Sequence, residues 1–274
     1  MKTRAKSAFL MAPLLIIIFL GGYFLIAGAA VLSFFALREF AAAFGEKRPA
    51  TWVFWASLGV LYGGCLIKGV HAYILLPWAF ISLLLGFLSM FAMEKRDLQQ
   101  GMTTIMGVFY INFLAFHLVL VDSSFTSPVY VGGFPLSGLQ SYVWIIVLTA
   151  FGTDIFAYFT GMLLGSHKLC PSISPKKTVE GAAGGVLGSV VLCGLFGYFF
   201  LPGGFSTCIA IGIAGSIAAQ LGDLTASVIK RRIGIKDWGT LIPGHGGILD
   251  RIDSILFTAP LVYYILMMKV VFSI

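Results

Sequence analysis

Charged side chains are scarce in this sequence. Asp, Glu, Lys and Arg make up only 11% of its 274 residues, whereas hydrophobic residues make up 59% and the mean hydropathy is +0.97. These values lie outside the range of soluble globular domains and within that of proteins with many membrane-spanning segments. The few places where charge does occur therefore need a chemical explanation.

Several familiar signatures are also missing. The four cysteines show neither CxxC nor CxxH spacing, so we expect no zinc site and no disulfide framework (Cys65, Cys170, Cys193 and Cys208). There is no GxxxxGK[ST] and no GxGxxG, which argues against P-loop and Rossmann nucleotide sites. The net charge of +7 comes from short clusters between apolar runs rather than from one basic face, so we expect no nucleic-acid partner.

Long apolar segments predict an all-α, polytopic bundle of about nine transmembrane helices. The run after Lys6 is too long for a signal peptide and lacks a clear cleavage site, so it is interpreted as a retained helix. A helix crosses ~30 Å of hydrocarbon in ~20 residues, so Phe9–Phe44 is divided into two spans at its glycines. The other predicted spans are Trp52–Ile67, Ala72–Met93, Thr103–Val121, Ser141–Leu164, Gly181–Leu201, Ser206–Ile229 and Ser254–Phe272.

The distribution of Lys and Arg orients these spans. With a cytoplasmic N-terminus, the basic loops all lie on the cytoplasmic side and the C-terminus lies outside. The Asp122–Gln140 connection contains no Lys or Arg and is predicted outside, while Lys68 is the single exception. Glycine faces on the spans 181–201 and 206–229 predict close helix packing and make a homodimer plausible.

Charge is concentrated in Ser227–Asp253, near the C-terminus. Asp223 precedes this stretch and, like Asp154, lies inside a predicted span, where an Asp costs ~2.5–3.5 kcal/mol and is a functional candidate. A neighbouring Lys or Arg that merely neutralises each carboxylate is the structural alternative. Helical spacing places Asp223 on one stripe with Gln220, Ser227 and Lys230.

Carboxylates on two helices suit a hard divalent cation, most plausibly Mg²⁺. Asp250 and Asp253 share a face of the last predicted helix, although each could instead cap it. Basic side chains surround the same point, as expected for polyphosphate with a metal (Lys168, Lys176, Lys177, Lys230, Arg231, Arg232 and Lys236). Taken singly, Lys176 or Lys177 is more plausibly topological charge. The turn at His245 offers backbone amides to phosphate oxygens.

The spacing of these residues resembles the signature of phosphatidate cytidylyltransferases, also called CDP-diacylglycerol synthases. The matching positions are Ser227, Lys230, Arg231, Lys236, Asp237, Gly239, Ile242, Pro243, His245, Gly246, Gly247, Ile248, Asp250, Arg251, Ile252 and Asp253. The segments Asp154-x-x-Ala157-Tyr158-x-x-Gly161 and Ser174-Pro175-Lys176-Lys177-Thr178-x-Glu180-Gly181 also look like family motifs. The resemblance covers roughly the C-terminal half of the chain.

The resemblance implies transfer of a cytidylyl group from CTP to phosphatidic acid with Mg²⁺, giving CDP-diacylglycerol and pyrophosphate for phospholipid biosynthesis. Residues 1–100 would then form N-terminal transmembrane helices, and residues 101–274 a catalytic transmembrane domain with a cytoplasm-facing polar cavity. We expect an integral protein of a bacterial inner membrane, with CTP, phosphatidic acid and the bilayer as partners.

Roles follow as hypotheses for individual residues. The expected metal ligands are Asp223 and Asp250, with Asp154 and Asp253 as further ligands, and a second cation is allowed for. The expected catalytic and phosphate-binding residues are Asp223, Lys230, Arg231, Lys236, Asp237, His245, Asp250 and Arg251. The expected substrate-binding residues are Tyr158, Ser174, Lys176, Lys177, Glu180 and Ser227.

Two alternatives remain open from the residues themselves. A CTP-dependent polyprenol or phytol kinase would use similar carboxylates and cations but transfer the γ-phosphate. An ion-coupled transporter would use Asp154 and Asp223 as ion sites near the middle of the membrane. The absence of matching charged sites in the first half of the chain weakens the transporter interpretation.

Overall fold

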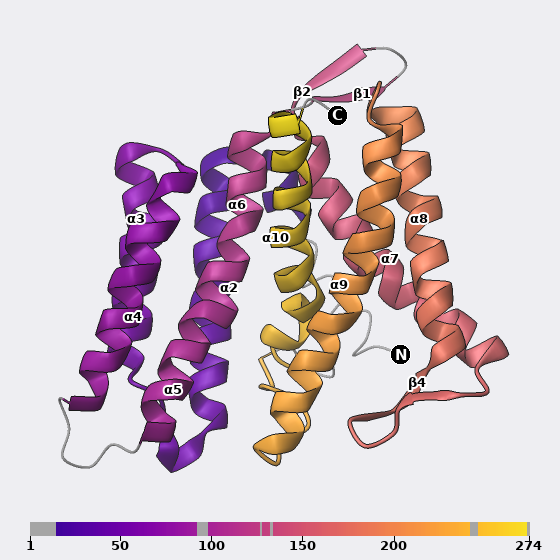
Figure 1. Ribbon diagram of the computed structural model, residues 1–274. Helices are drawn as coiled ribbons and strands as arrows, with labels where there is room; N and C mark the ends of the chain where they lie inside the picture. The colour runs from indigo at the N-terminus through magenta and orange to yellow at the C-terminus, as the bar shows by residue number, and fades with distance from the viewer. Residues whose placement is uncertain (1–14, 92–97, 127, 132–133, 242–245, 273–274) are drawn as a thin grey trace. The chain divides into compact units, whose positions relative to one another are not determined.

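The computed structural model describes residues 15–91, 98–126, 128–131, 134–241 and 246–272, which are overwhelmingly helical (Figure 1). The chain divides into two compact units. The first consists mainly of Gly22–Leu120 and Asp237–Arg251, and the second mainly of Val121–Lys236 and Ile252–Ile274. The polar stretch recognised in the sequence is therefore divided between them, since Asp237–Arg251 belongs with the N-terminal helices.

The first unit is built from antiparallel apolar helices. They are α2 (Gly22–Ala43), α3 (Thr51–Lys68), α4 (Leu75–Phe91), α5 (Leu98–Gly107), the π-helical segment η3 (Val108–Phe113) and most of α6 (Leu114–Ser124), with the short 3₁₀ turns η1 (Gly45–Lys47) and η2 (Ala72–Ile74). α2 packs on α3, and α4 packs on α5. Phe40, Phe54 and Trp78 are buried between them, and the Trp78 indole satisfies its N–H by donating to the Ser57 carbonyl.

The second unit contains four long helices. They are α7 (Ser141–Leu164), α8 (Val179–Phe200), α9 (Phe205–Arg232) and most of α10 (Leu249–Phe272). α8 packs against both α7 and α9. Two antiparallel hairpins complete the unit: β1 (Pro128–Val131) with β2 (Phe134–Gln140), and β3 (Lys168–Cys170) with β4 (Ser174–Thr178).

Glycines allow these helices to approach backbone to backbone. A Cβ on Gly181 of α8 would lie 2.8 Å from the Ala157 carbonyl oxygen of α7, and one on Gly212 of α9 would lie 2.9 Å from Val190 Cα of α8. A Cβ on Gly222 of α9 would lie 2.5 Å from the Asp253 carbonyl oxygen of α10. The close packing predicted from the glycine faces is confirmed.

The predicted membrane helices are confirmed over the described residues, where eight helices are long and apolar enough to span a bilayer. Residues 9–14 of the expected first span lie outside the described part of the chain, and residues 15–20 are helical. The sequence-based prediction omitted the two hairpins, which are too short to leave a periodic signal. The cytoplasmic N-terminus and the outside C-terminus stay predictions.

The end of α9 is three residues later than predicted, so that it includes the cations Lys230–Arg232. Gly234, with φ of +80°, reverses the chain there, and the Ile235 N–H donates to the Lys230 carbonyl. This is the Schellman arrangement that satisfies the last carbonyls of a helix. With 28 residues, α9 is about 42 Å long, so its basic last turn extends past ~30 Å of hydrocarbon.

Candidate functional site

Three aspartates from three helices form an acidic centre in the second unit. They are Asp154 of α7, Asp223 of α9 and Asp253 of α10, and the charges of Asp154 and Asp223 act on the buried Asp253. Ser254 links two of the helices, since its hydroxyl lies 3.5 Å from Asp154 Oδ2 while its N–H donates to Asp253 Oδ1. Because Gly222 has no side chain, α9 can approach the α10 backbone at this level.

Two lysines supply the opposite charge. Lys177 Nζ lies 2.5 Å from Asp223 Oδ2, with about a third of each side chain exposed. Lys230 is only 8% exposed and attracts Asp253 electrostatically. The hydroxyl of Ser227 lies 3.5 Å from Asp223 Oδ1, which confirms that Asp223 and Ser227 share one helix stripe. The structure thus places carboxylates and ammonium groups together at one end of a membrane helix.

The β3–β4 hairpin positions Lys177 and its neighbour Lys176. Its second strand leads directly into α8, where the Thr178 hydroxyl accepts a hydrogen bond from the Gly181 N–H as the helix N-cap. The capping interaction fixes the direction in which the strand arrives. Ser174 and Lys176 lie on this same strand, so the motif residues Ser174–Thr178 have an extended conformation.

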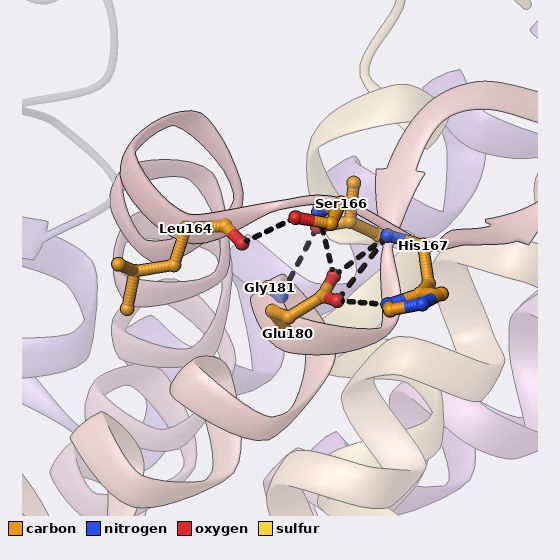
Figure 2. A network of polar contacts seen from close by, with 6 residues as sticks. Leu164, Ser166, His167, Glu180 and Gly181 are labelled. Carbon is orange, nitrogen blue, oxygen red and sulfur yellow. Dashed lines mark hydrogen bonds and ion pairs between the residues drawn. The ribbon is translucent and has the colours of Figure 1, made fainter.

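Glu180 closes the base of this hairpin. Its carboxylate accepts hydrogen bonds from the Ser166 and His167 backbone N–H groups, and it lies 2.6 Å from His167 Nδ1 (Figure 2). Figure 2 shows the carboxylate between the end of α7 and the start of α8. The structure therefore gives Glu180 a turn-stabilising role, and its predicted contact with substrate stays a prediction.

A cavity of about 350 Å³ lies between the hairpin and the acidic centre. Its polar lining comes from Asp154, Tyr158, Lys176, Lys177 and Asp223. The rest of the wall is apolar or small, from Ala157, Gly161, Met162, Leu169, Gly181, Ala182 and Leu224, with Thr178 and Gln220. A cavity that joins charged groups to an apolar wall suits an anionic head group that carries hydrocarbon chains.

The remaining predicted cations lie near the end of α9. Arg231 is exposed and donates to the carbonyls of Ile173 and Ile235, so it ties the hairpin turn to the helix end. Lys236 and Asp237 are exposed in the turn that follows, and Arg251 is half-buried in the first turn of α10. Phosphate binding by Arg231, Lys236 and Arg251 stays a prediction.

Asp250 belongs to the first unit, where it organises the loop before α10. Its Oδ2 atom accepts hydrogen bonds from the backbone N–H groups of Trp238 and Gly247. The Gly247 amide, predicted as a phosphate contact within the His245 turn, is therefore already used. His245 itself lies outside the described residues. Because Asp223 and Asp250 belong to different units, their joint binding of a metal stays a prediction.

Sequence reasoning missed Glu39. This residue lies within apolar α2, is 9% exposed, and accepts hydrogen bonds from the backbone N–H groups of Ile248 and Leu249. The signal that would have found it is the one that identified Asp154 and Asp223, an acidic residue inside a predicted span.

The donor chemistry of the acidic centre fits Mg²⁺. Among the described residues, no three His, Cys, Asp or Glu side chains form a group that would hold a metal by themselves. Mg²⁺ commonly takes only one or two carboxylates and completes its shell with waters and substrate phosphates. Of the three aspartates, Asp154 and Asp223 line the cavity, whereas Asp253 is 7% exposed, and metal binding by any of them stays a prediction.

Comparison with known proteins places these features in context. A family model described as "Cytidylyltransferase family" matches residues 2–269. A phosphatidate cytidylyltransferase from Synechocystis is 36% identical over 271 aligned residues, which cover 90% of each chain. A protein of the same name from Bacillus subtilis is 45% identical over 127 residues, about half of each chain (46% and 47%). A chloroplastic one from Arabidopsis thaliana is 39% identical over 59% of this chain and 43% of the relative.

Proposed function

This chain belongs to the cytidylyltransferase family, and we propose that it transfers the cytidylyl group of CTP to phosphatidic acid within a membrane. The products are CDP-diacylglycerol and pyrophosphate. The observation that carries this proposal is the match to the family model over residues 2–269. The phosphatidate cytidylyltransferase from Synechocystis, which aligns over 90% of each chain, supports it. In this proposal the two substrates meet at the cavity in the second unit, which has both charged and apolar walls.

The reaction joins two anions. An oxygen of the lipid phosphate forms a bond to the α-phosphorus of CTP. The bond between that phosphorus and the oxygen that bridges the α- and β-phosphates breaks, and pyrophosphate leaves with the electron pair of the broken bond. The lipid phosphate is already ionised near neutral pH, so no strong general base is needed. The protein must instead reduce the electrostatic repulsion between the lipid phosphate and the triphosphate. It must also align the attacking oxygen with the leaving pyrophosphate.

The side chains of the second unit meet these requirements. Lys177 and Lys176 lie along the cavity wall, where they would neutralise phosphate oxygens, while Lys230 supplies a buried positive charge that attracts Asp253. Asp223 would hold Mg²⁺, with Asp154 and Asp253 as further ligands. The bound ion would supply charge neutralisation of the triphosphate and of the pyrophosphate leaving group. Met162, Leu169 and Leu224 give the cavity the apolar wall along which an acyl chain would lie.

The family resemblance assigns roles in the same reaction to further residues, two of which lie in the first turn of α10. Asp250 would be a further metal ligand, and Arg251, Lys236 and Arg231 would bind phosphates. Ser227, Ser174 and Glu180 would contact substrate, and Asp237 and His245 would act near the reacting phosphates. The cavity would open toward the cytoplasm of a bacterial inner membrane, where CTP is available. A homodimer stays a proposal that the small-residue helix faces allow.

The position of the label in the product tests this proposal. Purified protein is incubated with phosphatidic acid, Mg²⁺ and CTP labelled at either the α- or the γ-phosphate. We expect α-label in the lipid phase and γ-label in water as pyrophosphate, with both signals lost on chelation by EDTA and restored by Mg²⁺. A lipid kinase, given a lipid alcohol in a parallel reaction, would instead place γ-label in that alcohol and release CDP. Substrate flux into sealed vesicles without nucleotide turnover would point to a transporter.

A further inference from the structure

The buried carboxylate of Glu39 connects two parts of the chain that are 209 and 210 residues apart. Its Oε1 atom accepts a hydrogen bond of 3.0 Å from the Ile248 N–H, and its Oε2 atom one of 2.9 Å from the Leu249 N–H. Leu249 is the first residue of α10, and Asp250 is the second. Glu39 therefore holds the beginning of the helix that carries Asp250.

Only a carboxylate can make both contacts. Each of its oxygens accepts a hydrogen bond from a different backbone N–H, whereas the amide of Gln has one acceptor and one donor. An Asp would have the correct charge, but its side chain is shorter by one methylene, so its carboxylate would lie further from the two N–H groups. The negative charge also lies at the positive end of the α10 dipole, where it is most stabilising. The N–H groups at a helix N-terminus often bind phosphate. At the start of α10, the Ile248 and Leu249 N–H groups already donate to Glu39, so they are not available to a phosphate.

Two glycines of the loop fit closely around this carboxylate. A Cβ on Gly247 would lie 2.4 Å from Glu39 Oε2, and a Cβ on Gly239 would lie 2.7 Å from Glu39 Oε1. Any other residue at either position would displace the carboxylate from its hydrogen bonds. The two glycines thus have a common structural explanation, which is space for Glu39.

The loop around Glu39 is the one that fixes Asp250. The Gly247 N–H donates to Asp250 Oδ2 at 3.0 Å, and the Trp238 N–H donates to the same oxygen at 2.9 Å. Trp238 is 3% exposed, and its ring lies 5.5 Å from that of Phe40, the residue after Glu39. Glu39 and Asp250 therefore bind neighbouring backbone N–H groups, Glu39 those of Ile248 and Leu249, and Asp250 those of Trp238 and Gly247.

From this geometry we infer that Glu39 is a positioning residue for the reaction, which orients Asp250 and the start of α10 without touching substrate. The inference rests on the proposed function, in which Asp250 is a metal ligand. Residues that orient metal ligands typically change affinity or activity about 10- to 100-fold when they are replaced. A residue that only stabilised the fold would leave the activity of the folded protein unchanged.

The test compares Glu39→Gln and Glu39→Asp with Glu46→Gln, a matched control at an exposed position on η1. Three readouts are needed: thermal unfolding in detergent, Mn²⁺ affinity by electron paramagnetic resonance without substrate, and kcat and KM for CTP. We expect Glu39→Gln to lower kcat or Mn²⁺ affinity about 10- to 100-fold per folded molecule, and Glu39→Asp to recover part of the loss. Glu46→Gln should match the wild type in all three.

Gly247→Ala covers the case in which Glu39→Gln does not fold, and a double-mutant cycle then tests whether its effect depends on the Glu39 carboxylate. Gly247→Ala should reproduce the defect in an otherwise unchanged chain. In a Glu39→Ala background, where the carboxylate is absent, the same added methyl group should cost several-fold less. Equal costs in the two backgrounds, or wild-type kinetics and Mn²⁺ binding in folded Glu39→Gln, would overturn the inference. If the wild-type protein made no CMP-bearing lipid, the proposed function would fail, while the metal-binding and unfolding comparisons would still test Glu39.

Discussion

Lys177 and Asp223 form an ion pair between the β3–β4 hairpin and α9, with Lys177 Nζ 2.5 Å from Asp223 Oδ2. Asp223 was expected either to bind a metal or to be neutralised by a neighbouring cation, and in this structure it is neutralised. The pair is only partly buried, so it is open to exchange with a ligand. A phosphate that binds Lys177 and a cation that binds Asp223 would each release the other partner.

Exchanging the two charges separates a structural role for this pair from a chemical one. In Lys177→Asp with Asp223→Lys, the opposite charges remain adjacent, so we expect thermal stability close to that of the wild type. Activity should fall at least about 100-fold, because neither a phosphate nor a divalent cation finds its partner in the original place. Recovery of activity in the exchanged protein would show that the pair serves the fold alone.

Asp223→Asn removes one charge with almost no change in shape. We expect turnover below about 0.1% of the wild type, by analogy with the loss of a group that stabilises charge in a transition state. Folding and membrane insertion should persist. Glu46→Gln is the matched carboxylate-to-amide control, and CMP-lipid formation is the measurement. More than about a tenth of wild-type turnover in Asp223→Asn would remove Asp223 from the metal site.

Gly222→Ala tests whether close contact between α9 and α10 sets the geometry of the acidic centre. The added methyl group would meet the Asp253 backbone, which cannot rotate away as a side chain would. We expect a loss of about 1–3 kcal/mol in unfolding free energy, as for overpacked interiors, and lower activity. Gly59→Ala on α3 is the control, since a Cβ there meets nothing within 4 Å. Equal unfolding temperatures for the two variants would contradict the packing argument.

Thr178→Val should destabilise the start of α8. Val has nearly the same shape as Thr but cannot accept the hydrogen bond from the Gly181 N–H, a change that costs about 1 kcal/mol at a helix N-cap. Thr225→Val is the control, because the Thr225 hydroxyl only donates to the Leu221 carbonyl within α9. Thermal unfolding of both variants in the same detergent gives the comparison. A Thr178→Val protein as stable as Thr225→Val would argue against the cap.

The predicted orientation is open to a labelling test. Ser172→Cys on the β3–β4 turn and Ser206→Cys at the start of α9 are both exposed. They are introduced singly after the four native cysteines have been replaced. In right-side-out vesicles, a membrane-impermeant maleimide should label Ser206→Cys but not Ser172→Cys, and inside-out vesicles should give the reverse. Labelling of both positions from the same side would refute the predicted topology.

Much of the second unit followed from the sequence because its signals are local. A charged residue in an apolar helix is conspicuous, so Asp154 and Asp223 could be selected and then placed with Asp253. Spacing along one helix predicted that Ser227 lies beside Asp223, and the structure agrees. Repeated glycines predicted close helix contacts, which Gly181 and Gly222 make with backbone atoms of neighbouring helices.

What escaped prediction depends on contacts between distant segments. Helix periodicity does not indicate that Lys177 pairs with Asp223, because the lysine is on a short strand and the aspartate is on a helix. It also does not indicate that Asp250 accepts hydrogen bonds from Trp238 and Gly247. The role of Glu39 was missed for the same reason, since its partners lie some 210 residues further along the chain.

The grouping of Asp237–Arg251 with the N-terminal helices has a practical consequence for dividing this protein. A fragment that begins at residue 101 would keep every motif residue recognised in the sequence, yet it would lose the anion that neutralises the start of α10. The backbone N–H groups of Ile248 and Leu249 would then lack an acceptor in a region where little water is available to replace it. Such a fragment should regain its order only when α2 is supplied as a separate peptide, so the half of the chain without recognisable motifs remains indispensable.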